Sequence, residues 1–559
     1  MGLGDGFDGS ESDLARGPHL VDVVVVGAGF AGLYSVYRLR QLGYSTIVLE
    51  SAPSIGGTWY HNRYPGARCD IESLDYSFSF DADLQQEWRW SERYAAQPEI
   101  LRYMNHVADR FDLWRDIQLN TRVVSADFDE GTQRWTVTTE NGESFSAQFC
   151  IMATGVLSAA QVPAMPGLDT FSGEWFHTAD WPLDPVDFSS RRVGVIGTGS
   201  SGTQLIPIVA DQAAQLTVFQ RTANYCMPAQ NRPLDERTDR EWKANYPERR
   251  AFARQSSFGH NQIANPLNGA DVSAAERAEE FQRRWDLGGL YMMRAFKDIM
   301  VDADVNAEAV AFVHRKIDEI IDDPATAEAL KPRDLYIGTK RLCSGTNYYE
   351  TFNLPHVRLV DVKADPIVEI TPTGIRTQSN EFELDVIVFA TGFDAMTGSV
   401  LRIDPRGRGG QRLSDKWSSG PKTYLGISVN GFPNMFIVAG AGSPSVFSNM
   451  VNSIEQHVEW ITRAIDEARK AGIGVLEASA EAESDWVAHV NELAERTLYG
   501  KSRKTWFYGA NTPGKAQVFM PYVGGVGNYA TRLSAIADDG YHGFETQPES
   551  TPTRDHARA

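Results

Sequence analysis

The sequence lacks the features that define several common protein classes. Its 559 residues include only four cysteines, which lie far apart and form no CxxC pair, so neither a disulfide framework nor a zinc site is expected. No apolar run approaches the roughly 20 residues that span a bilayer. The first twenty residues are polar and acidic, with Arg16 as their only Lys or Arg, and do not resemble a signal peptide. We therefore expect a cytoplasmic protein with reduced thiols and no metal.

Positive charge is also scarce. The chain has 53 Lys and Arg against 73 Asp and Glu, a formal net charge of -20. Nucleic acids and anionic membranes are bound by clustered basic residues, so neither is expected as the main partner, although a local basic pocket remains compatible with this charge. The remaining composition, 42% hydrophobic and 23% charged, is that of a globular protein. Since single cores stop growing at roughly 250 to 300 residues, we expect several domains.

A glycine-rich turn near the start of the chain has the spacing of a dinucleotide-binding unit. Residues 21–26 (VDVVVV) predict a strand buried on both faces, and Gly27, Gly29 and Gly32 lead into a helical stretch. A second strand, STIVL, ends at Glu50, where an acid accepts the ribose hydroxyls. The glycines permit the tight turn and the approach of a pyrophosphate to the helix N-terminus. The position of this unit at the start of a long chain favours FAD over NAD.

The same pattern recurs in RRVGVIGTGSSGTQ, where a strand leads into Gly197, Gly199 and Gly202. The strand that follows, LTVFQ, ends at Arg221 and Thr222 rather than at an acid. A guanidinium can bind a 2'-phosphate that a carboxylate would repel, so the second nucleotide is predicted to be NADP. An Arg that lies on the surface without a ligand is the alternative.

Two further strands end in Ala-Thr-Gly, at CIMATG (150–155) and VIVFATGF (386–393). Each resembles the segment that links the flavin and pyridine nucleotide domains in flavoproteins with two dinucleotide sites. Short apolar strands that end in glycine are common, so neither is specific alone. Together with the two glycine-rich turns they predict an α/β fold with two Rossmann-like domains, one for FAD and one for NADP.

A longer motif narrows the family. Residues 171–182 (FSGEWFHTADWP) match every fixed position of FxGxxxHxxxWP, the pattern of the type I Baeyer–Villiger monooxygenases. Related N-oxygenating flavin monooxygenases share the first half of this pattern but usually lack its ending, so Trp181 and Pro182 favour ketone oxygenation. Residues 56–70 (GGTWYHNRYPGARCD) resemble the second family signature, GGxWxxxxYPGxxxD. His61 departs from it, because relatives often carry Trp there. This segment is expected near the flavin and the nucleotide, and the shape of the site at His61 is therefore not predicted.

The resemblance extends from about residue 20 to about residue 540. Further segments that match the family are GTKRLCSGTNYYETFN (338–353), GSPSVFSNMVNSIEQHVEW (442–460) and KTWFYGANTPGK (504–515). Among members of the family they are most similar to phenylacetone and steroid monooxygenases. The resemblance implies an enzyme that carries FAD, takes a hydride from NADPH and inserts one oxygen atom of O2 next to a ketone carbonyl, giving an ester or lactone through a C4a-peroxyflavin.

The resemblance also implies catalytic roles. Arg341 should stabilise the peroxyflavin anion and the later oxyanion, Lys340 should contact the NADP 2'-phosphate, and Asp70 should pair with Arg341 and orient it. Trp506 matches a mobile-loop Trp that closes over the nicotinamide and excludes water. Without the resemblance, a Lys-Arg pair would be read as a solvated loop and Trp506 as a core side chain. His177 is expected to link domains rather than to carry protons.

Cofactor contacts carry over in the same way, residue by residue. The FAD site is expected to include Thr58, Trp59, Asp70, Tyr76, Val123 and Met450, besides the first glycine-rich turn and Glu50. The NADP site is expected to include Arg68, Cys69, Thr198, Ser200, Ser201, Gln204, Arg221, Thr222, Lys340 and Trp506, besides the second glycine-rich turn.

The expected domains are discontinuous. An FAD-binding domain is assigned to 18–160 and 385–540, because the second Ala-Thr-Gly strand is expected to return to it. An NADP-binding domain is assigned to 161–232 and 334–384. Residues 233–333 have helical apolar spacing and are expected to form a helical subdomain that also walls the substrate cavity. Residues 541–559 are expected to be a flexible tail.

Other functions remain open at this point. An N- or S-oxygenating flavin monooxygenase is the nearest alternative enzyme, and a nucleotide-sensing binding protein could keep both glycine-rich turns without catalysis. A disulfide reductase would need a redox cysteine pair, which the cysteine spacing does not supply. The expected substrate is a bulky cyclic or aryl ketone, although apolar pockets discriminate weakly between similar substrates. The sequence does not set the oligomeric state, and a monomer is compatible with it.

Overall fold

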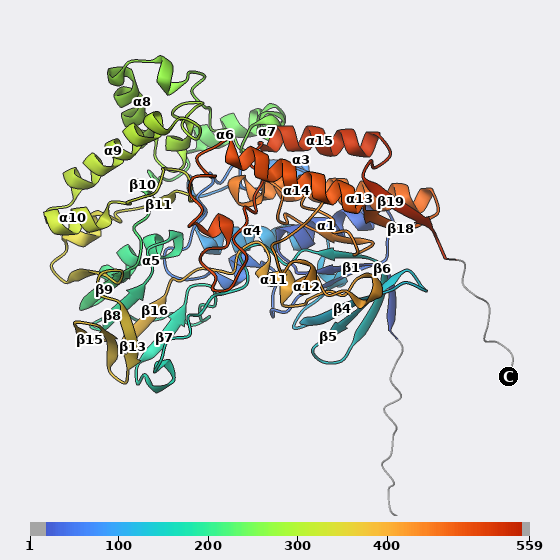
Figure 1. The fold of residues 1–559 in the computed structure, drawn as a ribbon, viewed down its shortest axis with the longest axis horizontal. Coiled ribbons are helices and arrows are strands. Elements are labelled where there is room, and N and C mark those ends of the chain that lie inside the picture. The colour runs from blue at the N-terminus through green and yellow to red at the C-terminus, as the bar shows by residue number, and fades with distance from the viewer. Residues whose placement is uncertain (1–17, 551–559) are drawn as a thin grey trace, which may run out of the picture.

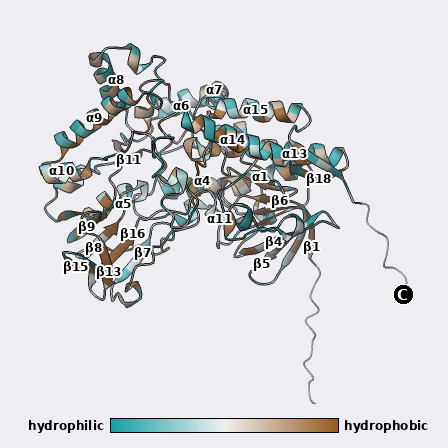
Figure 2. Ribbon diagram, viewed as in Figure 1, coloured by the Kyte–Doolittle hydropathy of each residue, from teal (hydrophilic) through white to brown (hydrophobic). Residues whose placement is uncertain are grey.

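The computed structural model describes residues 18–550 and confirms the expected α/β class with parallel sheets. Two sheets lie beside each other, with a group of helices above one of them and long helices above the other (Figure 1). The strands are largely apolar, whereas the outer helices alternate polar and apolar residues (Figure 2). Within residues 18–550, no helix combines the length and the apolar character that crossing a bilayer requires.

The first sheet has the order β3-β2-β1-β6-β5-β4, with β17 also paired to β6. Its central strand β1 (His19–Val26) runs parallel to β2 (Thr46–Leu49) and to β6 (Ser144–Met152). Alternate valines of β1 belong to two separate hydrophobic clusters, Val23 and Val25 to one and Val24 and Val26 to the other. The continuous apolar run is therefore explained, because both faces of the strand are covered.

Helices contribute to one of these two clusters and a hairpin contributes to the other. Helices α1 (Phe30–Gln41) and α13 (Met450–Lys470) contact each other and contribute to the first cluster. The antiparallel strands β4 (Val123–Asp129) and β5 (Arg134–Thr139) contribute to the second. The elements of this half that remain are β3 (Ile117–Gln118), α2 (Thr58–His61), α3 (Ala82–Glu87), α4 (Gln97–Arg110), α11 (Gly398–Leu401), α12 (Leu413–Lys416), β17 (Met435–Ile437), α14 (Ala480–Glu495) and α15 (Val526–Asp538).

The second sheet is parallel throughout and has the order β12-β9-β8-β16-β7. Its strands are β7 (Glu174–His177), β8 (Arg192–Ile196), β9 (Gln215–Gln220), β12 (Val357–Asp361) and β16 (Val386–Phe389), and α5 (Ser200–Ala210) connects β8 to β9. A small antiparallel sheet of β13 (Ile367–Thr371), β14 (Gly374–Thr377) and β15 (Glu381–Glu383) lies beside them, as does the parallel pair β10 (Cys226–Pro228) and β11 (Cys343–Gly345).

Strand β16 corrects one expected boundary. Its second Ala-Thr-Gly sequence was expected to return to the first domain at residue 385, yet Val386 pairs with Val193 of β8 and with Glu174 of β7. The four residues of β16 are fully buried between neighbouring strands, which is the environment that an unbroken VIVF sequence favours. The chain therefore returns to the first sheet after β16, not before it.

The two segments that connect the sheets run side by side. Residues 156–161 lead from the first sheet to the second and residues 392–396 lead back; we call them the crossing segments. Ala160 forms an antiparallel bridge with Phe393, and the Gln161 amide donates to the Gly392 carbonyl at 3.1 Å. The Asp394 amide donates to the Ala159 carbonyl at 2.9 Å. These contacts make the joint between the sheets a hydrogen-bonded pair of segments rather than two independent linkers.

Residues 233–333 contain five α-helices and no strand. They are α6 (Glu236–Ala244), α7 (Tyr246–Gln255), α8 (Ala274–Leu287), α9 (Ala303–Ile320) and α10 (Pro324–Leu330), and Figure 1 shows α8, α9 and α10 above the second sheet. Helix α8 starts with a capping box in which Ser273 and Glu276 exchange side-chain and backbone hydrogen bonds.

The C-terminal segment also departs from expectation. Residues 541–559 were expected to form a flexible tail, but Phe544–Pro548 form β19, which pairs antiparallel with β18 (Ile473–Ala478). The Phe544 ring packs 5.6 Å from the Trp460 ring, so an aromatic contact anchors the strand. The part of the expected tail at 551–559 lies outside the described residues.

Candidate functional site

A cavity of about 1700 Å³ lies between the two sheets and reaches both glycine-rich turns. Nearly all of the residues that the sequence nominates for cofactor binding or catalysis line it. They are Gly27, Gly29, Glu50, Thr58, Trp59, Arg68, Cys69, Asp70, Tyr76, Val123, Gly197, Thr198, Gly199, Ser200, Ser201, Gln204, Arg221, Thr222, Lys340, Arg341, Met450 and Trp506. Gly32 and Gly202 are not among the lining residues. Of the segment 233–333, which was expected to wall the cavity, only Arg333 lines it.

The first glycine-rich turn is shaped by close backbone contacts. Gly27 has φ +104°, and a Cβ there would lie 2.6 Å from the Ala153 carbonyl oxygen. A Cβ on Gly32 would lie 1.9 Å from the Gly27 carbonyl oxygen, so this glycine allows α1 to pack on the turn rather than to touch a ligand. Helix α1 begins after Gly29 without a side-chain cap. Its first N–H groups are therefore available to an anion such as a pyrophosphate.

The second turn repeats this geometry. Gly197 has φ +111°, with a Cβ position 2.4 Å from the Ala390 carbonyl oxygen, and a Cβ on Gly202 would lie 2.2 Å from the Gly197 carbonyl oxygen. Nothing lies within 4 Å of a Cβ built on Gly199, and α5 begins after it without a side-chain cap. Both turns thus lie against the alanine of an Ala-Thr-Gly sequence and present uncapped helix ends to one cavity. The residues present fit two dinucleotides.

Glu50 is held rigidly at the end of β2. Its carboxylate accepts hydrogen bonds from the Ala28 amide at 2.7 Å and from the Ala52 amide at 2.8 Å. The residue is 5% exposed and lines the cavity. These bonds fix the carboxylate beside the first turn, where a ribose would lie if a dinucleotide bound there.

Positive charge gathers near the second turn. Arg221 and Thr222 follow β9 and are exposed, and Lys340 lines the same cavity. Burial and, to a lesser degree, the repulsion from Arg221 lower the pKa of Lys340. Arg333 and Lys363 also line the cavity, although no motif in the sequence marks them. The basic pocket that the net charge left open is therefore present.

Arg341 and Asp70 form a paired, partly buried site. Arg341 donates through Nε and Nη2 to the two carboxylate oxygens of Asp70, the latter at 2.8 Å, and through Nη1 to the Val446 carbonyl at 2.6 Å. Burial alone would lower the pKa of the guanidinium, but the charge and hydrogen bonds of Asp70 raise it above its ordinary value. Val446 follows Ser445, whose φ of +37° turns the backbone at this point.

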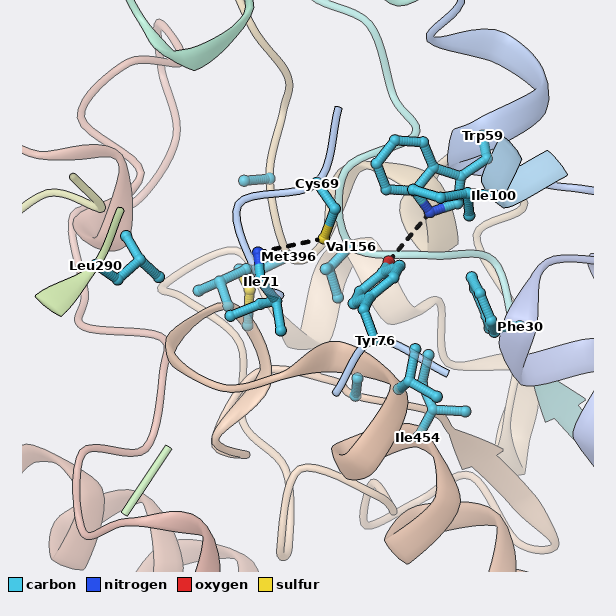
Figure 3. Close-up of a cluster of buried hydrophobic side chains, with 14 of the residues drawn as sticks. Phe30, Trp59, Cys69, Ile71, Tyr76, Ile100, Val156, Leu290, Met396 and Ile454 are labelled. Carbon is cyan, nitrogen blue, oxygen red and sulfur yellow. Dashed lines mark hydrogen bonds between the residues drawn. The ribbon is translucent and has the colours of Figure 1, made fainter. Parts of the chain in front are cut away.

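Trp59, Cys69 and Tyr76, which Figure 3 shows in an apolar and aromatic cluster, line the same cavity as this pair. The Trp59 indole donates to the Tyr76 hydroxyl at 3.1 Å, and Ile454 of α13 lies nearby. The Cys69 sulfur accepts from the Ile71 amide at 3.4 Å. Burial raises the pKa of both Tyr76 and Cys69, so both remain protonated at neutral pH and act as neutral surfaces.

Gln204 joins the two halves of the site. Its side-chain oxygen accepts from the Tyr64 hydroxyl at 2.9 Å, and its amide nitrogen donates to the Arg68 carbonyl at 3.1 Å. Gln204 belongs to α5, whereas Tyr64 and Arg68 follow α2. The side chain of Arg68 pairs with Glu92 at 2.7 Å. The sequence motif predicts Gln204 as a nucleotide contact and carries no signal for this contact between domains.

His177 lies at the end of β7 and does not line the large cavity. Its Nδ1 accepts from the Ala179 amide at 3.1 Å, and its Nε2 lies 3.1 Å from the Thr391 hydroxyl, which donates to the Gln161 carbonyl at 2.7 Å. Burial lowers the pKa of His177. This part of the motif 171–182 is thus connected to the crossing segments and not to the Arg341 pair.

Four other motif residues line this cavity or a second one. His61 lines the large cavity from α2, and burial lowers the pKa of its imidazole. Trp181 and Pro182 line a separate cavity of about 850 Å³. Trp506 opens a short 3-10 helix (Trp506–Tyr508) and lines the large cavity, with its ring 4.3 Å from that of Phe507.

Comparison with known proteins identifies the family. Residues 21–236 match the family model described as flavin-binding monooxygenase-like. A Baeyer–Villiger monooxygenase from Pseudooceanicola batsensis is 45% identical over 93% of this chain and 95% of that protein. A phenazine N-monooxygenase from Lysobacter antibioticus is 42% identical over 94% and 96%. A solved structure of oxidized steroid monooxygenase bound to NADP has 50% identity and a TM-score of 0.91, covering 95% of this chain and all of that chain. As its motifs predict, the chain belongs to the type I Baeyer–Villiger monooxygenases.

Proposed function

We propose that the protein is an NADPH-consuming, FAD-dependent monooxygenase that inserts one oxygen atom of O2 next to a ketone carbonyl and gives an ester or lactone. The observation that carries this proposal is the Arg341–Asp70 pair, which lies in the one cavity that both glycine-rich turns also line. Bound FAD would supply the oxygen-activating centre, and NADPH would supply the hydride.

The two nucleotides are assigned to the two turns. FAD would bind at the first turn and Glu50, with Thr58, Trp59, Asp70, Tyr76, Val123 and Met450. NADPH would bind at the second turn, with Arg68, Cys69, Thr198, Ser200, Ser201, Gln204, Arg221, Thr222, Lys340 and Trp506. The uncapped N-termini of α1 and α5 support this assignment, since each leaves N–H groups for a pyrophosphate.

Arg341 is suited to stabilising an anionic oxygen. A guanidinium has five N–H groups, and the three hydrogen bonds to Asp70 and Val446 use three of them. Two N–H groups, on the two Nη atoms, are left for a developing oxyanion. Because the Asp70 pair holds the guanidinium in place and charged, little reorganisation is needed as negative charge develops.

Other residues are proposed to position the nucleotide and exclude water. Lys340 would meet the 2'-phosphate together with Arg221, and Trp506 would close over the nicotinamide. His177 would connect the motif to the crossing segments, which its contact with Thr391 and the bond from Thr391 to the Gln161 carbonyl support. A bulky cyclic or aryl ketone is the proposed substrate class. We also propose a cytoplasmic location, with no nucleic-acid or membrane partner.

A second candidate is N-oxygenation, which the 42% identity to a phenazine N-monooxygenase favours. The two reactions place different demands on the site. A ketone carbon needs a nucleophilic, anionic oxygen, whereas an aromatic nitrogen attacks an electrophilic one. A fixed cation such as Arg341 stabilises the anionic form, so the geometry favours ketone oxygenation.

The test is a panel of linear, aryl, monocyclic and polycyclic ketones, together with phenazine, given to the purified holoenzyme with NADPH and air. Product, NADPH use and hydrogen peroxide are measured for the wild type and for Arg341→Ala. We expect esters or lactones from the wild type, and in the variant a loss of product of about a hundredfold or more while NADPH is still oxidised. Hydrogen peroxide as the sole product from every ketone would refute the proposal, and oxygenation of phenazine alone would favour the second candidate.

A further inference from the structure

The segment that carries Trp506 is fixed at its far end by one lysine. Lys515 Nζ donates to Asp394 Oδ1 at 2.6 Å and to the Ala395 carbonyl at 2.7 Å. The lysine side chain is 12% exposed and the aspartate side chain 31%, so the ion pair is largely shielded from water. Asp394 and Ala395 belong to the second crossing segment.

The stem of the same lysine supports the turn beside Trp506. Gly509 ends the short helix that Trp506 begins, and its φ is +75°. A Cβ built there would lie 3.1 Å from Cδ and 3.2 Å from Cγ of Lys515. The aliphatic part of Lys515 therefore packs against this turn while its ammonium group reaches the crossing segment.

A second side chain makes a parallel connection. Asn511 donates through Nδ2 to the Phe393 carbonyl at 2.9 Å. Its backbone carbonyl accepts from Nε2 of Gln161 at 3.0 Å. Gln161 ends the first crossing segment, and Phe393 lies in the second. Residues 502–515 are thus attached to both crossing segments.

We propose that Lys515 is a positioning residue for oxygenation. Its ion pair with Asp394 holds Trp506 at the cavity wall and sets that position by the geometry of the crossing segments. A positively charged group with more than one N–H is needed because two acceptors, a carboxylate and a carbonyl, converge on one point. This inference rests on the proposed function, because it states that Lys515 raises the fraction of NADPH oxidation that yields product rather than hydrogen peroxide.

The experiment compares Lys515→Met with Lys515→Arg, Trp506→Ala and the double variant Lys515→Met/Trp506→Ala. We expect Lys515→Met to keep FAD and to oxidise NADPH, with product per NADPH lowered about threefold or more and hydrogen peroxide raised to match. Lys515→Arg should restore most of the yield. The double variant should be no worse than Trp506→Ala alone, because Lys515 acts through Trp506. Lys501→Ala is the matched control, since Lys501 is exposed in the same part of the chain.

A second measurement does not depend on a ketone. Trypsin cleavage after Arg503 and Lys504, in the holoenzyme with NADP, should be about threefold faster or more in Lys515→Met than in the wild type and in Lys501→Ala. The inference would be overturned if Lys515→Met had the product yield and the cleavage rate of the wild type. It would also be overturned if Lys515→Arg lost as much product yield as Lys515→Met, or if the losses of yield in the two single variants added up in the double variant. If the wild type oxygenates no ketone, the proposed function fails, while the cleavage rates still decide whether Lys515 fixes the segment.

Discussion

Arg341 and Asp70 are 271 positions apart in the chain and form a two-contact ion pair across the joint between the two sheets. Asp70 ends the segment that follows α2 of the first half, and Arg341 lies just before β11, which pairs with β10 of the second half. The pair can form only when both halves are folded and correctly placed. The formation of this ion pair therefore depends on the relative position of the two nucleotide sites.

Replacing Asp70 with Asn should weaken oxygenation more than it weakens NADPH oxidation. Arg341 keeps its charge, but burial is no longer opposed by a carboxylate, so its pKa falls and its orientation loosens. We expect product formation to fall by about 10- to 100-fold, as for other partners that orient a functional group. Rapid-mixing kinetics of flavin reduction and product yield measure the two steps. Asp83→Asn, at an 85% exposed carboxylate, is the control, and equal loss in both steps would contradict the assignment.

Arg221 should determine the choice between NADPH and NADH. Removing one charge-assisted contact, with Arg221→Ala, should raise the KM for NADPH by about 10- to 100-fold and leave that for NADH nearly unchanged. Arg221→Asp should shift the ratio further, because a carboxylate repels the 2'-phosphate. The ratio of kcat/KM for the two nucleotides is the measurement, with Arg237→Ala, exposed on α6, as the control. An unchanged ratio in Arg221→Asp would show that another cation binds the phosphate.

Two glycines of the second turn should respond differently to the same added methyl group. In Gly199→Ala the methyl enters open space in the cavity, so the fold and FAD content should persist while NADPH binding weakens by about tenfold. In Gly202→Ala it would lie 2.2 Å from a backbone oxygen, which should cost about 1–3 kcal/mol of stability. Thermal unfolding and NADP titration separate the two effects. The opposite ranking, with Gly199→Ala the less stable variant, would sink this distinction.

His457 should make the protein sensitive to acid. The fully buried imidazole accepts from the Ala439 amide at 2.9 Å through Nδ1 and lies 2.8 Å from the Tyr529 hydroxyl through Nε2, and burial lowers its pKa to about 3. As the pH falls below 6.5, the unfolded chain binds a proton that the folded chain does not, so stability is lost. The loss from this group is about 2 kcal/mol between pH 6.5 and pH 5.

His457→Asn keeps an acceptor for the Ala439 amide but cannot take up the proton. Between pH 6.5 and pH 5, the free energy of unfolding of this variant should therefore fall by about 2 kcal/mol less than that of the wild type. Denaturant titrations at several pH values measure it. His260 should still contribute, since burial also lowers its pKa well below 6.5. A variant with the same pH slope as the wild type would exclude His457 as a source of the acid sensitivity.

Local features of the site were predictable from the sequence. The run VDVVVV, the glycine spacings and the acid at position 50 each depend on neighbours within one βαβ unit, where local geometry leaves few alternatives. The Lys340-Arg341 pair was recognisable only through family resemblance. Its partner contact with Val446 carries no sequence signal, because a backbone carbonyl has no residue type that marks it.

Two of the departures from expectation share a cause. Residues 386–389 form a short apolar strand that suits either sheet, and only its pairing with β8 and β7 assigns it to the second. Residues 544–548 are polar enough to suggest a tail, yet the free edge of β18 and the Trp460 ring give them partners. In both cases the outcome depends on elements far away in the chain.

The sequence by itself determined the two nucleotide-binding turns, their strands and helices, and the charge type at each site, because these follow from backbone sterics and local hydrogen bonding within short segments. Only the tertiary structure decided that Arg341 also reaches the Val446 carbonyl, that Gln204 reaches Arg68, and that Lys515 ties the Trp506 segment to the crossing segments. Such contacts depend on how two separately packed sheets are placed against each other, and no local pattern of residues encodes that placement.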